Sequence, residues 1–168
     1  FIVRAQFPWQ RQPMVPVKLE VTHDEPVLLE CPRVPVDHGY GEDLGATVKA
    51  YSLEEICAEK LRSTRQTQAK LAARGWVRPR ARDFYDLWHL ARLEAGRINW
   101  QKVSDILPTK CGTRKVTVKG IDDIFAPVLL DEVRSSWKAT LGPFVKDLPA
   151  VEQVLQQTRA RLAELLVF

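Results

Sequence analysis

The sequence of 168 residues has no apolar run long enough to cross a membrane, and its N-terminus lacks the layout of a signal peptide. These absences predict a cytoplasmic protein. Cysteine is scarce as well: the three residues Cys31, Cys57 and Cys111 are odd in number and too widely spaced for pairs of metal ligands. This usage is typical of reduced thiols, and we assign them no chemistry.

Several catalytic motifs are also missing. The chain contains no Gly-x-Ser-x-Gly, no His-Glu-x-x-His, no Cys-x-x-Cys and no Walker loop. Serine hydrolases, zinc enzymes and P-loop NTPases therefore lose support as function classes.

The residues that are present predict one globular domain with a real core, since 45% are hydrophobic and 27% are charged. The net charge of +4 is unevenly placed, because the segment 61–82 has no acidic residue. Its basic residues are Arg62, Arg65, Lys70, Arg74, Arg78, Arg80 and Arg82. This basic segment suggests a polyanionic partner. A solvated helix end followed by a loop is the alternative interpretation.

Hydrophobic periodicity predicts an α+β fold, with a small antiparallel or mixed sheet in residues 1–51 and a helical bundle in residues 52–168. Strands are expected at 1–7, 15–22, 26–30 and 47–51. Helices are expected at 52–73, from about 79–81 to 93, at 99–107, 119–125, 127–141 and 150–166. Ser52 followed three residues later by Glu55 is a capping box that marks the start of the first long helix.

Lys60 is unusual within that first helix. At 3.6 residues per turn it falls inside the apolar stripe formed by Leu53, Ile56, Cys57, Leu61 and Thr64. A buried and unpaired ammonium would cost several kcal/mol. Lys60 is therefore expected to extend its charge to solvent, to pair with an acid, or to line a cleft.

Two acidic features accompany Lys60. Asp83 and Asp86 are three residues apart on the predicted second helix, so their carboxylates are neighbours that call for a nearby cation. A helix N-terminus explains Asp83 well and Asp86 less well. Glu20 shares a predicted strand face with Lys18, which by itself is typical of a solvated ladder of charges.

Three blocks of sequence together resemble the later motifs of the AbiEii-type nucleotidyltransferases, the toxins of type IV abortive-infection systems. The blocks are Val17-Lys-Leu-Glu-Val-Thr22, Tyr51-Ser-Leu-Glu-Glu-Ile-Cys-Ala-Glu-Lys-Leu-Arg62 and Ala81-Arg-Asp-Phe-Tyr-Asp-Leu-Trp88. The resemblance implies that the strands are the remainder of a palm like that of DNA polymerase β.

The resemblance also implies site roles. Glu20 is expected to bind Mg²⁺, Lys60 to contact nucleotide phosphates, and Asp83 and Asp86 to lie in the same cleft. The basic residues Lys18, Arg62 and Arg82 complete the expected set for binding a nucleoside triphosphate. An RNA acceptor and a cognate antitoxin are the expected macromolecular partners, and the chemistry is attack on an α-phosphate.

One family motif is missing. The sequence contains no Gly-Ser and no Asp-x-Asp, and residues 1–7 resemble a strand in mid-course. We therefore expect a truncated nucleotidyltransferase toxin that is inactive alone. The alternative is a non-catalytic helical module that binds nucleic acid or an antitoxin through the basic segment 61–82.

Overall fold

The computed structural model describes residues 1–37, 41, 45–75, 79–93 and 96–168. The strands in these ranges are β1 (Ile2–Ala5), β2 (Val15–Lys18), β3 (Arg33–Pro35) and β4 (Thr47–Lys49). The helices are α1 (Leu53–Arg74), α2 (Ala81–Leu90), α3 (Trp100–Thr113), the short 3-10 helix η1 (Ile121–Asp123), α4 (Pro127–Leu141) and α5 (Val151–Leu165). The predicted α+β class is confirmed, with the described strands before Ser52 and the described helices after it. The division into two domains stays a prediction.

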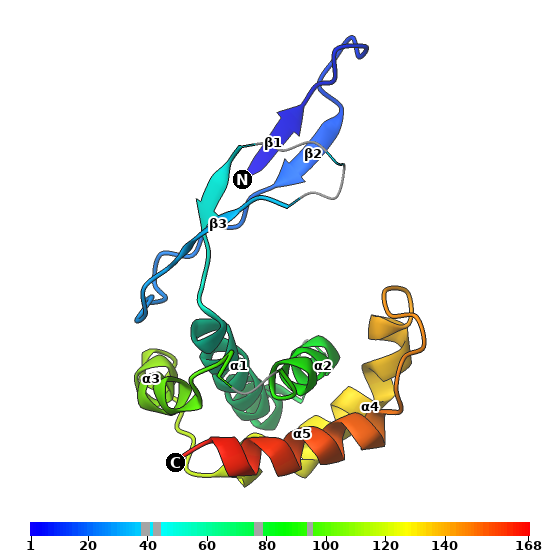
Figure 1. The fold of residues 1–168 in the computed structure, drawn as a ribbon. Coiled ribbons are helices and arrows are strands. Elements are labelled where there is room, and N and C mark those ends of the chain that lie inside the picture. Colours follow the sequence, from blue (N-terminus) through cyan, green and yellow to red (C-terminus); the bar gives the residue numbers. More distant parts are fainter. Residues whose placement is uncertain (38–40, 42–44, 76–78, 94–95) are drawn as a thin grey trace.

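The strands form two separate antiparallel pairs rather than one sheet. In the first pair Ile2 lies opposite Lys18 and Val3 opposite Val17. In the second pair Val34 lies opposite Val48. Figure 1 shows the pairs as an extended arm that stands away from the helices.

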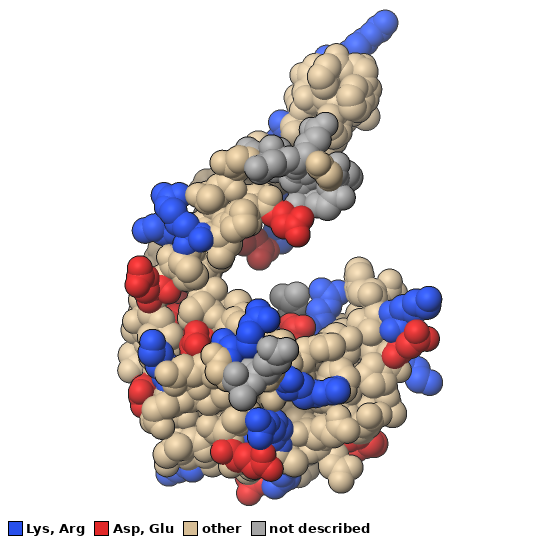
Figure 2. Space-filling model, viewed as in Figure 1, with Lys and Arg blue, Asp and Glu red and all other residues tan. Residues whose placement is uncertain are grey.

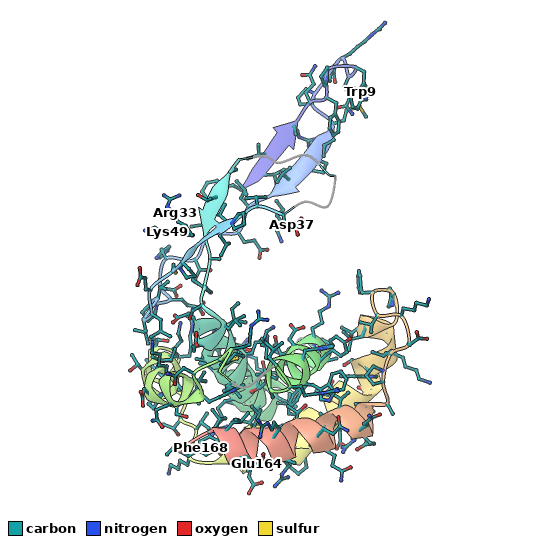
Figure 3. The ribbon with its side chains drawn as sticks, viewed as in Figure 1. Trp9, Arg33, Asp37, Lys49, Glu164 and Phe168 are labelled. Atoms are coloured by element: carbon teal, nitrogen blue, oxygen red, sulfur yellow. The ribbon has the colours of Figure 1, made fainter. Side chains whose placement is uncertain are left out.

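The part of the arm formed by residues 1–22, which contains β1 and β2, contributes nothing to the core. None of residues 1–22 is buried. At its far tip Trp9, labelled in Figure 3, stacks on Phe7 with 4.7 Å between ring centroids. Because a two-stranded hairpin without a packed face is only marginally stable, this arm depends on the residues that follow it for its attachment.

The predicted strand at 26–30 is wrong, because these residues lie outside the four strands and β3 begins at Arg33. Backbone amides of this segment donate to a side chain instead of to a neighbouring strand. The amides of Leu28 and Leu29 donate to the Glu55 carboxylate on α1, at 3.1 and 3.3 Å. The apolar run therefore fastens the arm to the helices instead of extending a sheet.

Helix α1 begins and ends where the sequence predicts. The Ser52 hydroxyl oxygen accepts a hydrogen bond from the Glu55 amide at 3.2 Å. At the other end Gly75 adopts a left-handed conformation with φ of +74°, and its amide donates to the Leu71 carbonyl. A side chain at Gly75 would make this conformation costly, which explains the glycine.

Helices α2, α4 and α5 pack together with α1 around one core. The predicted apolar face of α2 is confirmed, since Phe84, Leu87, Trp88 and Ala91 are all buried. Phe84 meets Phe125 edge to face, with 5.3 Å between ring centroids. Figure 1 shows α1 and α2 on the side of this helical body that faces the arm.

Helix α3 is longer than predicted, because it continues past Pro108 to Thr113. Proline removes one backbone hydrogen bond and favours a helix end. Here the additional turn buries Lys110 and Cys111 against α1, and this packing outweighs the local preference. Among the residues that the structure covers, none of the helices combines the length and apolar character needed to cross a membrane.

Candidate functional site

Lys60 lies between the two aspartates of α2. Its Nζ is 3.3 Å from Asp83 Oδ1 and 2.5 Å from Asp86 Oδ2. The side chains of Lys60 and Asp83 are 20% and 17% exposed, whereas that of Asp86 is 46% exposed. Of the alternatives open from the sequence, the structure shows the ion pair, because the ammonium turns toward both acids rather than away from them.

Asp83 is held by further donors. Arg80 Nη1 donates to the Oδ2 atom of Asp83 at 3.0 Å, and the Ser63 hydroxyl lies 3.3 Å from the same oxygen. Arg80 Nε also donates to the Thr67 hydroxyl, at 2.6 Å. The residue before α2, the first turn of α2 and the middle of α1 are therefore joined through Asp83.

The environment of Lys60 keeps it charged. Burial lowers the pKa of the ammonium, but the hydrogen bonds and negative charges of Asp86 and Asp83 outweigh burial, and the pKa is raised. Lys60 is therefore a fixed positive charge at neutral pH. It suits the binding of an anion and does not suit proton transfer.

Two hollows meet at Asp83. The first has a volume of about 280 Å³ and is lined by Tyr51, Ile56, Glu59, Lys60, Arg62, Ser63 and Asp83. The second has a volume of about 390 Å³ and is lined by Pro79, Arg80, Arg82, Asp83 and Thr140. The Lys60 cluster, by which we mean Lys60, Asp83 and Asp86, thus stands beside space that a ligand can enter.

The other predicted residues lie in different surroundings. Lys18 and Glu20 form an ion pair on the arm, with side chains 73% and 76% exposed. Strand β2 ends at Lys18, so the predicted strand to Thr22 is too long. Glu20 therefore follows the strand, and its ion pair with Lys18 is the one that a solvated ladder of charges predicts.

Arg62 is buried and committed to acidic partners. Its Nη2 donates to Glu25 at 2.9 Å and to Glu59 at 2.5 Å, and its Nη1 donates to Gln66. Arg82 is exposed instead, and its guanidinium carbon lies 4.9 Å from the centroid of the Phe144 ring.

Comparison with known sequences now decides the family. The sequence model described as "Nucleotidyl transferase AbiEii toxin, Type IV TA system" matches residues 1–157. The chain belongs to the AbiEii family. Its members are nucleotidyltransferase toxins of type IV toxin–antitoxin systems, and the resemblance inferred from the three sequence blocks is confirmed. Comparisons with curated proteins and with solved structures give no match.

The basic segment 61–82 of this AbiEii chain is not one solvated face. Arg62 is buried, and Arg65 donates to the Thr117 carbonyl at 2.8 Å. Lys70 and Arg74 are exposed on α1, while Arg78 lies outside the described residues. Figure 2 shows Lys and Arg interspersed with Asp and Glu over the visible side of the helical body. Part of the positive charge predicted to meet a polyanion therefore stabilises the fold.

A second charged cluster in the AbiEii chain escaped the sequence reasoning. Lys110 is 2% exposed, and its Nζ contacts two carboxylates of α1, those of Glu55 and Glu59, the latter at 2.7 Å. It also donates to the Pro26 carbonyl at 2.9 Å. We call Lys110, Glu55 and Glu59 the buried charge cluster. No hydrophobic periodicity marks Lys110, which follows Pro108 by two residues. The sequence feature that points to the cluster is the spacing of Glu55 and Glu59, four residues apart on α1.

A magnesium site does not form among the residues that the structure describes. No group of three or more His, Cys, Asp or Glu side chains there is arranged to hold a metal ion. Asp83 and Asp86 already share the Lys60 ammonium, and Glu20 pairs with Lys18. These donors do not fit Mg²⁺ as they stand, since the ion takes several oxygen ligands in octahedral geometry.

Proposed function

We propose that the Lys60 cluster is the phosphate-contacting part of a nucleotidyltransferase site, and that the complete enzyme transfers a nucleotide from a nucleoside triphosphate to an acceptor such as RNA. Membership of the AbiEii family supports the reaction class. The observation that carries the assignment is the ammonium of Lys60, held between Asp83 and Asp86 at the edge of the first hollow, which shares Asp83 with the second.

The charges around the cluster favour an anionic ligand. The described residues that line the two hollows include the cations Lys60, Arg62, Arg80 and Arg82 and the carboxylates Glu59 and Asp83. Asp86 adds one more negative charge through its ion pair with Lys60, which leaves the cations in excess by one. The excess of positive charge and the low exposure of Lys60 strengthen its attraction for a phosphate. Screening by solvent and salt limits that gain for the more exposed Arg82.

The two aspartates have different tasks in this proposal. Asp83 accepts from Lys60 and Arg80 and is mostly buried, so it positions both cations. Asp86 is the more exposed carboxylate and holds the Lys60 ammonium from the solvent side. Arg62 supports the fold through Glu25 and Glu59 rather than binding phosphate. The roles of Lys18 and Glu20 stay predictions.

Nucleotide binding tests the cluster directly. Lys60→Ala is expected to weaken binding of a labelled nucleoside triphosphate at least tenfold, because it removes a partly desolvated phosphate contact. Lys70→Ala is the matched control, since Lys70 is an exposed lysine on the same helix. Equal affinities of the two variants would overturn the assignment.

A further part of the proposal concerns transfer itself. Neither a Gly-Ser nor an Asp-x-Asp motif occurs in the 168 residues, and the described acids form no metal site. We propose that the chain alone is inactive. Incubation with labelled nucleoside triphosphates, Mg²⁺ and tRNA is expected to leave the RNA unlabelled, and any transferred label would contradict this.

The alternative is a non-catalytic module that uses the basic segment to bind nucleic acid or an antitoxin. The exposed Lys70 and Arg74 favour it, whereas the buried Arg62 does not. In that case Lys70→Ala would weaken binding of the polyanion and Lys60→Ala would leave it unchanged, which is the reverse of the pattern expected for nucleotide binding.

A further inference from the structure

An exposed aromatic ring stands beside the second hollow. Phe144 is 73% exposed, just beyond the end of α4, and the Arg82 guanidinium lies over its ring. Arg82 lines the hollow of about 390 Å³ together with Thr140 from the last turn of α4. An arginine from α2 and a phenylalanine after α4 thus form one surface, which we call the Arg82–Phe144 platform.

The backbone presents this ring in a defined position. The amide of Phe144 donates to the Leu141 carbonyl at 2.9 Å, and that of Val145 donates to the same carbonyl. Gly142 makes the tight turn possible, because a Cβ there would lie 2.6 Å from the Lys138 carbonyl oxygen. The turn is therefore ordered while the ring faces solvent.

The platform has the chemistry of a site for unpaired nucleotides. Bases stack on aromatic rings, and an arginine supplies both a flat stacking surface and a positive charge for the phosphate. Among the described residues, the one acid that lines the adjacent hollow is Asp83, which already pairs with Lys60 and Arg80. A polyanion that approaches the platform therefore meets a net positive charge.

We infer that the Arg82–Phe144 platform and its hollow bind a single-stranded segment of the RNA acceptor, with a base on Phe144 and a phosphate on Arg82. The inference rests on the proposed function, because the hollow shares Asp83 with the one that contains Lys60. An acceptor held there lies next to the nucleotide held at Lys60. Stacking favours RNA over an acidic protein, and an unpaired strand over a duplex, whose bases are not free to stack.

Fluorescence anisotropy with a labelled, unstructured RNA oligonucleotide tests the platform, with a duplex of the same RNA as the second probe. Phe144→Ala and Phe144→Leu are each expected to weaken single-strand binding about tenfold, within the range for one lost stack. Phe144→Tyr should retain it, because the ring remains. The control is Val128→Ala, which removes another exposed apolar side chain at the start of α4.

Three results would overturn the inference: no binding of the single strand by the unmodified chain, equal binding of strand and duplex, or full affinity in Phe144→Leu. Loss of affinity in Arg82→Gln, which removes the charge, without loss in Phe144→Leu would indicate a plain anion or acidic-protein site instead. The same variants are assayed for nucleoside triphosphate binding, which should remain unchanged in Phe144→Leu. Failure of nucleotide binding in the unmodified chain would count against the proposed function, and the RNA result would still decide the platform.

Discussion

Lys60 is the residue on which the proposed site depends, and its ion pairs also stabilise the fold. Lys60→Met leaves Asp83 and Asp86 close together without their shared cation. We expect a loss of about 1–2 kcal/mol in the free energy of unfolding, because the pair is partly buried but Asp86 is well solvated. Urea denaturation measures it, with Lys70→Met on the same helix as the control that should change little.

The pH dependence of that loss follows from the raised pKa of Lys60. Burial opposes the charged ammonium, but the bonds to Asp86 and Asp83 raise the pKa above the ordinary value of 10.5. The contribution is therefore fully present below about 10.5 and disappears as pH rises through the folded-state pKa. The difference in stability between the unmodified chain and Lys60→Met should be constant from pH 7 to 9 and should shrink above pH 10.5.

The cysteines give a test that requires no mutation. Burial raises the pKa of the Cys57 thiol to about 12 and that of Cys111 to about 11, whereas Cys31 is partly exposed. Iodoacetamide at pH 8 should modify Cys31 in the folded chain and all three thiols in urea. Rapid modification of Cys57 without denaturant would contradict the buried packing of α1 against its neighbours.

Helical spacing was enough to single out Lys60, and to place Asp83 and Asp86 together, because both follow from 3.6 residues per turn. That these residues contact one another depends on how α1 packs on α2, which no local pattern specifies. Arg62 shows the same limit. The sequence predicts a basic residue, but its acidic partners Glu25 and Glu59 decide that it is buried.

At the scale of the elements, the buried charge cluster fixes α3 against α1. Lys110→Met leaves Glu55 buried without a cation, and we expect a loss of about 3–5 kcal/mol. Lys110→Met combined with Glu55→Gln should recover part of it, since the remaining group is neutral. Urea denaturation of the two single variants and the double variant measures the coupling. Simple additivity of the two losses would contradict the ion pair.

The same cluster explains two elements that sequence patterns misplaced. Residues 26–30 have the apolar composition of a strand, but their amides and carbonyl bind Glu55 and Lys110. Helix α3 continues beyond Pro108 because its last turn carries Lys110 into this cluster. In each case a contact between residues far apart in the sequence outweighs a local preference.

For the whole molecule, the succession of strands followed by helices could be predicted, and their arrangement could not. Alternation and capping signals gave strands first and helices afterwards, as found in the described chain. Val17 and Leu19 lie on one face of the expected strand 15–22, yet both are exposed, as is Val3 in β1. Whether an apolar strand face is covered depends on what packs against it, and the sequence of the strand alone does not specify that partner.

In this arrangement the β1–β2 hairpin of the arm contributes little to the free energy of unfolding of the helical body. No side chain in residues 1–22 is buried, and β1 and β2 contact chiefly each other, as the space between arm and helices in Figure 2 also shows. Deleting residues 1–22 should therefore change the free energy of unfolding by less than about 1 kcal/mol.

A longer deletion supplies the contrast. Removing residues 1–30 also removes Glu25, a partner of Arg62 and Arg114, and the amides of Leu28 and Leu29 that bind Glu55. Buried charges on α1 then lose partners, and unfolding should become easier by several kcal/mol. Thermal and urea denaturation of both deletions measure the difference. Equal stability of the two would mean that the segment 24–29 does not anchor the arm, whereas a large loss already at residue 22 would mean that the hairpin packs on the helices in solution.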